Sequence, residues 1–258
     1  MKIYRKLLRN QKYRSYYALV RAIFKIKIFR CKVRTYEGFM PHVADNTIFS
    51  NKRRIVKNNK KYPHPRAKYL LGIDMDQSCS KSDLLIENYI KYKKSQRNLN
   101  EIDVLSIGPR TEGEIFNLYS HGFTLNKIKA IDLISYSKLI DIGDMHDLPY
   151  EDNKFDLVIL GWCIAYSDNK KMAIKEAIRV TRHGGTIAIG VSYSPKNNNE
   201  IIKNRGYLIG SKERLRSLKD ILNLFTPTAI DQLEFGIDIA ENHRHLPGQI
   251  VGLFRVKK

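Results

Sequence analysis

Residues 103–114 read D-V-L-S-I-G-P-R-T-E-G-E, and the rest of the chain is organised around this stretch. A short apolar run ends at Gly108, a charged turn follows, and a segment with helical spacing begins near Glu114. A strand, a glycine-bearing turn and a helix in this order bring free backbone N–H groups to the start of the helix, which suits an anionic or nucleotide-like ligand. The turn is unusual because Arg110 and Glu112 stand where such loops carry small residues.

Apolar, strand-like segments alternate with helix-like segments along the chain. The expected strands are 104–107, 128–133, 139–142, 155–160 and 186–191, and the expected helices begin at the capping box Ser80–Asp83, near Glu114, at 171 and at 215. Such alternation predicts a parallel sheet covered by helices on both faces. The last two strands, 233–239 and 250–256, leave no room for a helix between them. They are expected to pair antiparallel at one edge.

The positive charge of the chain is concentrated at its N-terminal end. The 258 residues carry a net charge of +20, and residues 1–70 contribute 20 lysines and arginines against two acidic residues. Such an arm is typical of proteins that face a polyanion, either RNA or an anionic membrane surface. An amphipathic helix docked on the main domain, with a solvated basic face, is the alternative interpretation. We therefore divide the chain into a basic helical and loop extension, residues 1–79, and a main domain, residues 80–258.

Size and composition exclude several classes of protein. The longest nearly apolar run, 157–166, is about half of the roughly 20 residues that a membrane-spanning helix needs. The basic N-terminus is not followed by an uninterrupted apolar stretch, so no signal peptide is expected. Three widely spaced cysteines, Cys31, Cys79 and Cys163, argue against a disulfide framework and a zinc site, and no metal is expected. These features predict a cytoplasmic protein, with peripheral attachment to a membrane as an alternative.

Two segments carry a resemblance to a known family. Residues 143–158, G-D-M-H-D-L-P-Y-E-D-N-K-F-D-L-V, resemble the G-D-A-x-x-L-P-F-x-x-x-x-F-D-x-V stretch of class I S-adenosylmethionine-dependent methyltransferases, type 11-like members in particular. Residues 177–185, A-I-R-V-T-R-H-G-G, resemble the R-V-L-K-P-G-G turn of the same family. The resemblance covers roughly residues 80–258. It implies an α/β, doubly wound, mostly parallel Rossmann-like sheet with an antiparallel terminal strand, to which the basic N-terminal extension is added.

By this resemblance the expected cofactor is S-adenosyl-L-methionine. Asp132 would hold its ribose hydroxyls, Asp144 its adenine amino group, and Met145 the face of the adenine. A carboxylate that ends the second strand suits a ribose diol in other doubly wound nucleotide sites as well. The candidate cofactor-binding residues are Gly108, Arg110, Glu112, Gly113, Asp132, Asp144, Met145 and Trp162.

The glycine-rich turn departs from the family pattern (D/E)-x-G-x-G-x-G, because Ser106 replaces the acid and two of the glycines are replaced. Arg110 could pair with the cofactor's carboxylate, and Glu112 or Glu114 with its ammonium group. Alternatively, the two acids are structural, since a carboxylate in the first turn suits the helix dipole. The turn would also fit a different anionic ligand, or a scaffold that has lost its cofactor.

Candidate catalytic residues follow from the rule that doubly wound sheets bind ligands outside the C-terminal ends of their parallel strands. The candidates are His243 and His245, between the last two strands, and Tyr166, after the strand 155–160. The chain lacks the (N/D)-P-P-(Y/F) stretch that is typical, by resemblance, of enzymes that methylate the amino group of adenine or cytosine. Cys163 is not preceded by a proline or threonine, as a cytosine-C5 nucleophile would be.

We therefore expect a methyltransferase with an unidentified acceptor, for which a saccharide or another small metabolite is favoured. Two alternatives stay open. One is an RNA methyltransferase whose substrate is positioned by the basic arm. The other is a non-catalytic methyltransferase-like module that binds nucleic acid or an anionic membrane surface through residues 1–70.

Overall fold

The computed structural model describes residues 30–35, 75–93, 98–109, 113–205 and 211–258. Most of the basic arm therefore lies outside the described residues. So do Arg110 and Glu112, the two charged residues of the turn, and their predicted roles stay predictions. In the part of the chain that the structure describes, no helix is both long and apolar enough to cross a bilayer.

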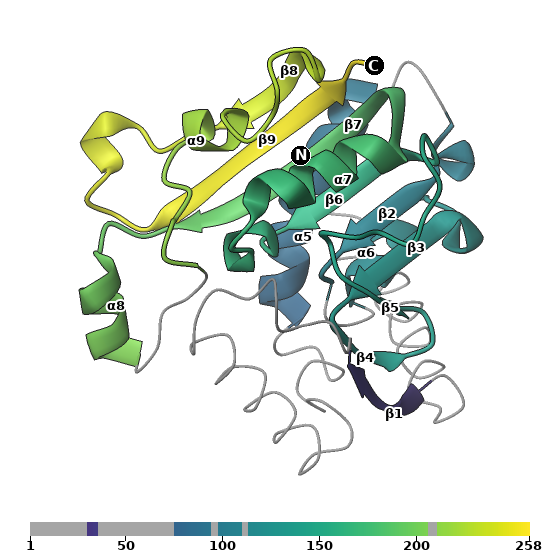
Figure 1. Ribbon diagram of the computed structural model, residues 1–258, viewed down its shortest axis with the longest axis horizontal. Helices are drawn as coiled ribbons and strands as arrows, with labels where there is room; N and C mark the ends of the chain where they lie inside the picture. The colour runs from purple at the N-terminus through teal and green to yellow at the C-terminus, as the bar shows by residue number, and fades with distance from the viewer. Residues whose placement is uncertain (1–29, 36–74, 94–97, 110–112, 206–210) are drawn as a thin grey trace, which may run out of the picture.

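A mixed sheet of seven strands forms the centre of the molecule, in the order β5-β3-β2-β6-β7-β9-β8 (Figure 1). Its strands are β2 Val104–Ile107, β3 Ile128–Asp132, β5 Asp141–Ile142, β6 Phe155–Gly161, β7 Thr181–Tyr193, β8 Ile230–Ile237 and β9 Gly248–Val256. The first five in this order are parallel, and β9 pairs antiparallel with both β7 and β8. The predicted fold class and the antiparallel pair at one edge are confirmed.

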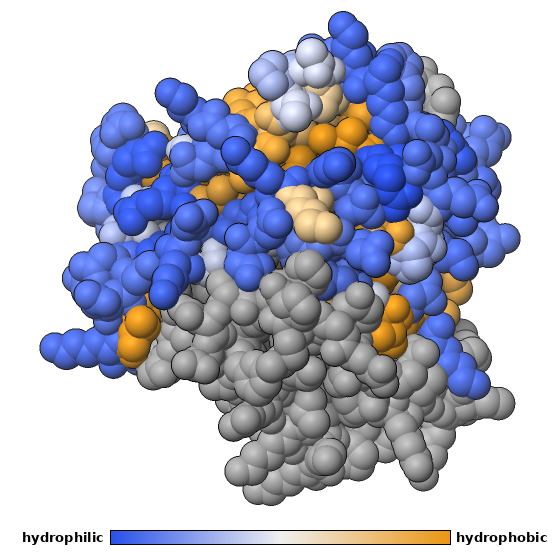
Figure 2. All heavy atoms as spheres, viewed as in Figure 1, coloured by the Kyte–Doolittle hydropathy of each residue, from blue (hydrophilic) through white to orange (hydrophobic). Residues whose placement is uncertain are grey.

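Helices cover both faces of the sheet. They are α5 Met75–Lys93, α6 Gly113–Ser120, α7 Lys170–Val180, α8 Asn198–Arg205 and α9 Leu218–Leu222, with short 3-10 turns η3 Leu99–Glu101, η4 Leu125–Lys127, η5 Ile164–Tyr166 and η6 Glu241–His243. One core cluster lies between the sheet and α7 and α9, and the other lies between the sheet and α5 and α6. Residues 157–160 of β6 alternate between these clusters, which explains why this part of the strand is apolar throughout. On the face in Figure 2, hydrophilic residues predominate around an apolar band near α7 and α9.

The helix after the glycine turn ends as predicted, at a glycine C-cap. Gly122 has a φ of 103°, and its N–H donates to the carbonyl of Tyr119 at 3.1 Å. The N–H of Phe123 donates to the carbonyl of Leu118 at 3.3 Å. This pair of bonds is a Schellman motif, which satisfies the last carbonyls of α6.

Two helix predictions require correction. Helix α5 begins at Met75, so the Ser80–Asp83 segment lies inside it rather than at its start. Within that segment, Ser82 accepts a tertiary hydrogen bond from the Asn117 amide of α6 at 2.8 Å. The helix expected over 215–225 is reduced to the five residues of α9, because Ser217 caps it through a bond from the Asp220 N–H.

Some elements were not predicted. Helix α8 is one. Strand β4, Ile134–Ser137, is another, and it pairs antiparallel with β1, Arg30–Thr35, in a separate two-stranded sheet. This pairing joins the N-terminal extension to the main domain. The predicted glycine turn at 183–185 lies inside β7, where Gly184 has a φ of 73° and the register with β6 shifts.

Candidate functional site

The turn after β2 depends on a glycine that packs against the next loop. Gly108 has a φ of 70°, and its N–H donates to the Ile131 carbonyl of β3 at 2.8 Å. A Cβ atom at this position would lie 2.5 Å from the Cβ of Cys163, which follows β6. Both the left-handed backbone and the close contact therefore require glycine. The three strand ends at β2, β3 and β6 are brought together at this point.

The acid that the family pattern expects on β2 is replaced by a pair of residues. Ser106, on β2, donates from its hydroxyl to Oε1 of Glu114 at 2.5 Å, and Glu114 lies in the first turn of α6. An Oε atom of Glu114 would lie 3.4 Å from a Cβ at Gly161, the last residue of β6. Helix α6 thus supplies a carboxylate to the strand ends.

Burial raises the pKa of the Glu114 carboxyl to about 7 from its usual 4.5, although the residue keeps some exposure. The hydrogen bond from Ser106 opposes this rise, and the negative charge of Asp132 adds to it. Sequence reasoning named Glu114 only as an alternative partner for the cofactor ammonium. The signal that could have singled it out is the serine at the position of the missing acid, because a serine there can bond a carboxylate brought by the helix.

Asp132 ends β3 beside this pair, as the sequence predicted. Its backbone carbonyl accepts the N–H of Gly143 at 3.1 Å, which holds the start of the next loop against β3. The charges of Asp132 and Glu114 also act on Cys163, whose thiol pKa is raised well above its usual value, chiefly by burial. The raised pKa favours the protonated thiol, which is the less nucleophilic form of cysteine. The site carries two neighbouring carboxyl groups.

Asp144 lies in a buried polar chain in the loop after β5. Its Oδ1 accepts from the N–H of His146 at 2.9 Å and lies 2.5 Å from Nδ1 of the same ring. Nε2 of His146 lies 2.6 Å from the hydroxyl of Ser167, which also accepts the N–H of Asn169. All three side chains are buried. These hydrogen bonds attach the loop that begins at Asp144 to the loop after β6. Met145, in the same loop, packs against the core on the α7 side.

Arg179, in the last turn of α7, holds the following part of the same loop. Its guanidinium donates to the carbonyls of Leu148 and Tyr150, both at 2.8 Å, and to the carboxylates of Glu176 and Asp152. Arg179 also lowers the pKa of Glu176 through its hydrogen bond. Arg179 belongs to the segment 177–185 that resembles the family. Through these hydrogen bonds it holds the other resembling segment, 143–158, in place.

Two candidate residues lie after β6. Trp162 has a φ of 62°, its N–H donates to the carbonyl of Gly190 at 2.8 Å, and its ring would lie 2.9 Å from a Cβ at Gly190. A positive φ is uncommon for a bulky residue and marks a constrained turn. Tyr166 is exposed in η5. The structure thus places Trp162 against the sheet, and Tyr166 at the surface of the same loop.

The candidate bases His243 and His245 are exposed, in the loop between β8 and β9. The hydroxyl of Tyr193 donates to the carbonyl of Arg244 at 2.8 Å, which joins this loop to the C-terminal end of β7. Strand β8 is four strands away from β2, roughly 19 Å at the usual strand spacing. The role of the two histidines as bases stays a prediction.

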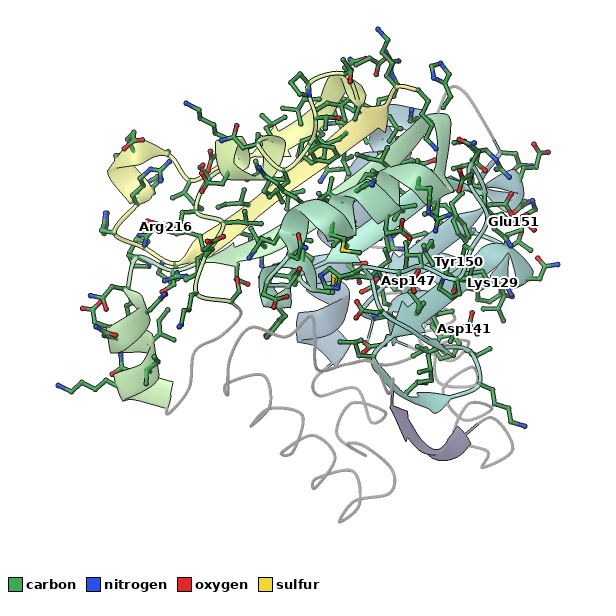
Figure 3. The ribbon with its side chains drawn as sticks, viewed as in Figure 1. Lys129, Asp141, Asp147, Tyr150, Glu151 and Arg216 are labelled. Atoms are coloured by element: carbon green, nitrogen blue, oxygen red, sulfur yellow. The ribbon has the colours of Figure 1, made fainter. Side chains whose placement is uncertain are left out.

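Polar side chains lie at two opposite ends of the sheet edge. Figure 3 shows Asp147 and Tyr150 grouped near Asp141 at one end and Arg216 at the other. The hydroxyl of Tyr150 donates to Asp141 at 2.9 Å. Gly113 is the first residue of α6, next to Glu114.

Comparison with known proteins agrees with this geometry. Residues 125–189 match the model of the methyltransferase domain family. Norajmaline N-methyltransferase of Rauvolfia serpentina is 44% identical over 57 residues, 22% of this chain and 19% of the relative. Ajmaline N-methyltransferase of the same plant is 45% identical over 49 residues, 19% of this chain and 17% of the relative. The matched segments thus span less than a fifth of these curated relatives.

A solved structure shows the same fold over most of the domain. The crystal structure of MccD protein aligns with a TM-score of 0.52 at 16% identity, covering 68% of this chain and 97% of the other. The seven-stranded sheet, the left-handed glycine after β2 and the family match over residues 125–189 lead to the same conclusion. These findings support a class I S-adenosylmethionine-dependent methyltransferase family for this chain.

Proposed function

We propose that this chain transfers a methyl group from S-adenosyl-L-methionine to a small-molecule acceptor. The observation that carries the proposal is the pair of carboxyl groups, Glu114 and Asp132, beside the left-handed turn at Gly108. The Glu114 carboxyl has its pKa raised to about 7 by burial and by Asp132. A cation bound between or beside these two carboxyl groups would favour the ionised form of Glu114 and so lower its pKa.

The residues present fit the cofactor in charge and in hydrogen bonding. Its methionine portion carries an ammonium group, for which the Glu114 carboxylate is the candidate partner, and its ribose carries a diol from which Asp132 can accept hydrogen bonds. Asp144 and Met145 are the candidates for the adenine, in a loop held in place by Arg179. When bound, the cofactor supplies an electrophilic methyl group on a sulfonium. The protein's own part is to bind, to orient and to exclude water.

The acceptor would enter from the loops after β6 and β7 and from the β8–β9 loop, which share the C-terminal edge of the sheet. Tyr166, His243 and His245 are the proposed proton acceptors there. Saccharides and other small metabolites are favoured as substrates. The relatives' names, which denote methylation of norajmaline and ajmaline, support a small acceptor.

Calorimetric titration with S-adenosylhomocysteine, the demethylated product, tests the proposal. We expect saturable binding in the micromolar range that is lost in Asp132→Ala. Asp231→Ala is the matched control, because Asp231 is a surface carboxylate of β8 paired with Arg255. Absence of heat with the wild-type protein at millimolar ligand would refute the proposed function.

A second candidate function rests on the charge of the N-terminal arm, where residues 1–70 hold 20 lysines and arginines and two acidic residues. In this proposal the arm binds RNA or an anionic membrane surface. Because β1 of this region pairs with β4, a deletion would disturb the fold, so the six basic residues of segment 52–61 are better changed to glutamine. Binding to single-stranded RNA should then lose roughly 0.7 of log-log salt slope for each phosphate contact removed. Unchanged binding to both RNA and anionic vesicles would rule this candidate out.

A further inference from the structure

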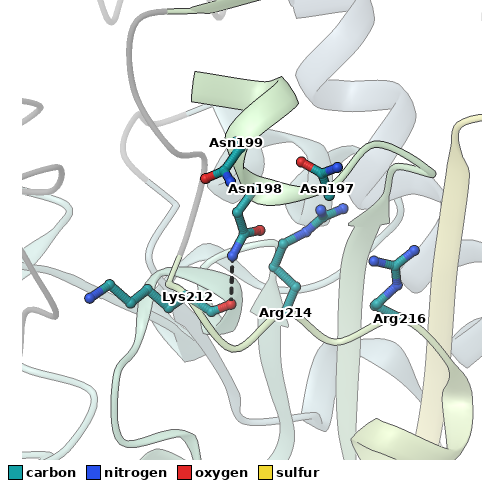
Figure 4. Close-up of a pocket in the computed structure, with 6 residues that line it drawn as sticks. All are labelled: Asn197, Asn198, Asn199, Lys212, Arg214 and Arg216. Carbon is teal, nitrogen blue, oxygen red and sulfur yellow. Dashed lines mark hydrogen bonds between the residues drawn. The ribbon is translucent and has the colours of Figure 1, made fainter. Parts of the chain in front are cut away.

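A polar pocket of about 280 Å³ lies at the far end of the sheet edge, between the start of α8 and the segment before α9. Three cationic side chains and three amide side chains line it: Asn197, Asn198, Asn199, Lys212, Arg214 and Arg216 (Figure 4). The amide of Asn198 donates to the Lys212 carbonyl at 3.0 Å and so joins the two sides of the pocket. Every lining side chain is either positively charged or an amide.

Arg214 is held in place by backbone groups. Its Nη1 donates to the Lys196 carbonyl at 2.6 Å, and its Nη2 donates to the Ser194 carbonyl at 2.8 Å. These bonds use two of the five N–H donors of the guanidinium and fix its plane. Neutral carbonyls provide no counter-charge. The guanidinium therefore keeps its full positive charge, and its remaining N–H donors can bind a ligand.

A second arginine lies close enough to interact with the first. The guanidinium of Arg216 lies 5.8 Å from the ring centroid of Tyr193. Burial, followed by the nearby charge of Arg216, lowers the pKa of Arg214. Within the described ranges, neither arginine forms an ion pair with a carboxylate. The two positively charged guanidinium groups thus repel each other, and a bound anion would offset this repulsion.

The acidic residues around the pocket have other partners. Glu200 accepts the N–H of Asn197 at 2.7 Å, and Asn197 accepts the N–H of Glu200 in return, which forms a capping box at the start of α8. Asp220 accepts the backbone N–H of Arg216 at 2.7 Å. The Glu213 side chain is exposed, and its charge acts on the buried amine of Lys170. The carboxylates of Glu200 and Asp220 are therefore used to cap helices.

The pocket borders the loops through which an acceptor would enter. Strand β7 runs to the lower left of Figure 1 and leads there into α8. The N–H of Ser211 donates to the Ala165 carbonyl at 2.8 Å, which attaches the segment before Lys212 to η5. Tyr166 is the next residue of that turn.

We propose that this pocket binds an oxyanion, a carboxylate or a phosphate group, carried by the methyl acceptor. The assignment of the anion to the acceptor rests on the proposed function, whereas the anion site itself does not. Arg214 and Arg216 supply the charge, and the amides of residues 197–199 supply neutral donors. The acceptor would then be an acidic small molecule, anchored at its anion while its methylated atom faces the cofactor.

Calorimetric titration of the full chain with inorganic phosphate and with succinate, at ionic strength matched by sodium chloride, tests the site. Arg216→Gln is the test variant, because the Arg216 side chain is exposed and makes no hydrogen bond in the described part of the chain. Loss of a charge-assisted bond should weaken binding roughly tenfold. Lys219→Gln, an exposed residue of α9 outside the pocket, is the control for net charge and should bind as the wild type does.

Tighter binding of phosphate or of succinate names the class of anion, and either result supports the site. Equal heats for both anions and for chloride, or equal affinity in wild type and Arg216→Gln, would overturn it. S-Adenosylhomocysteine is titrated in parallel. If it binds and no oxyanion does, the pocket assignment fails alone. If an oxyanion binds and S-adenosylhomocysteine does not, the proposed cofactor fails and the anion site stands.

Discussion

The raised pKa of Glu114 predicts that cofactor binding is linked to the release of a proton. In the cofactor-free protein the carboxyl has a pKa of about 7 rather than its usual 4.5. An ammonium group placed beside it would favour the ionised form and lower this pKa. If the pKa returned to 4.5, the difference would amount to about 3.4 kcal/mol of coupling, from about 1.4 kcal/mol per unit.

The size of the effect on affinity follows directly. At pH 6 roughly one in ten free molecules has Glu114 ionised, so the affinity for S-adenosylhomocysteine should be about tenfold weaker than at pH 8. Binding at pH 6 should release about 0.9 proton, which calorimetry in buffers of different ionisation enthalpy measures. In Glu114→Gln the pH dependence that is left belongs to the ligand itself.

Whereas the affinity for the ligand should rise with pH, the raised pKa of Glu114 makes the cofactor-free protein less stable as the pH rises. Between pH 4.5 and about 7 the folded state holds a proton that the unfolded chain has lost, so stability falls as the pH rises through this interval. Glu114→Gln should therefore stabilise the cofactor-free protein at pH 8, by up to about 3 kcal/mol, while it weakens cofactor binding. An affinity that does not change from pH 6 to pH 8, or that changes equally in the variant, would refute the reasoning.

Three further predictions concern the residues that shape the site. Gly108→Ala should destabilise the protein by about 1–3 kcal/mol in thermal unfolding, because of its φ of 70° and the contact with Cys163; an unchanged melting temperature would contradict this. Arg179→Met should cost about 2–3 kcal/mol and expose the 147–154 loop to protease, whereas protection equal to wild type would contradict the clamp. Trp162 is the single tryptophan, so Gly190→Ala, which crowds its ring, should shift the intrinsic fluorescence; an identical spectrum would show that the ring is not confined there.

The sequence by itself determined the architecture. The apolar periods of β2, β3, β6 and β9 and the cap of α6 at Gly122 are local signals, and local signals can be read without knowledge of the neighbours. The order of elements then places Asp132 at a strand end, since parallel strands end at one edge. The segment 143–158 was enough to indicate the family. The predicted start of α5 at Ser80 was wrong, because the helix extends back to Met75 and the Ser80–Asp83 segment lies within it.

Only the tertiary structure decided what the site is made of. Ser106 and Glu114 are eight residues apart, on a strand and a helix, and their pairing depends on how α6 packs on the sheet. The raised pKa of Glu114 comes from burial, which no local pattern contains. The pocket around Arg214 unites the start of α8 with a later loop, and each segment alone is a polar surface stretch. Local periodicity specifies elements, whereas contacts between distant segments set the charge and the enclosure of a site.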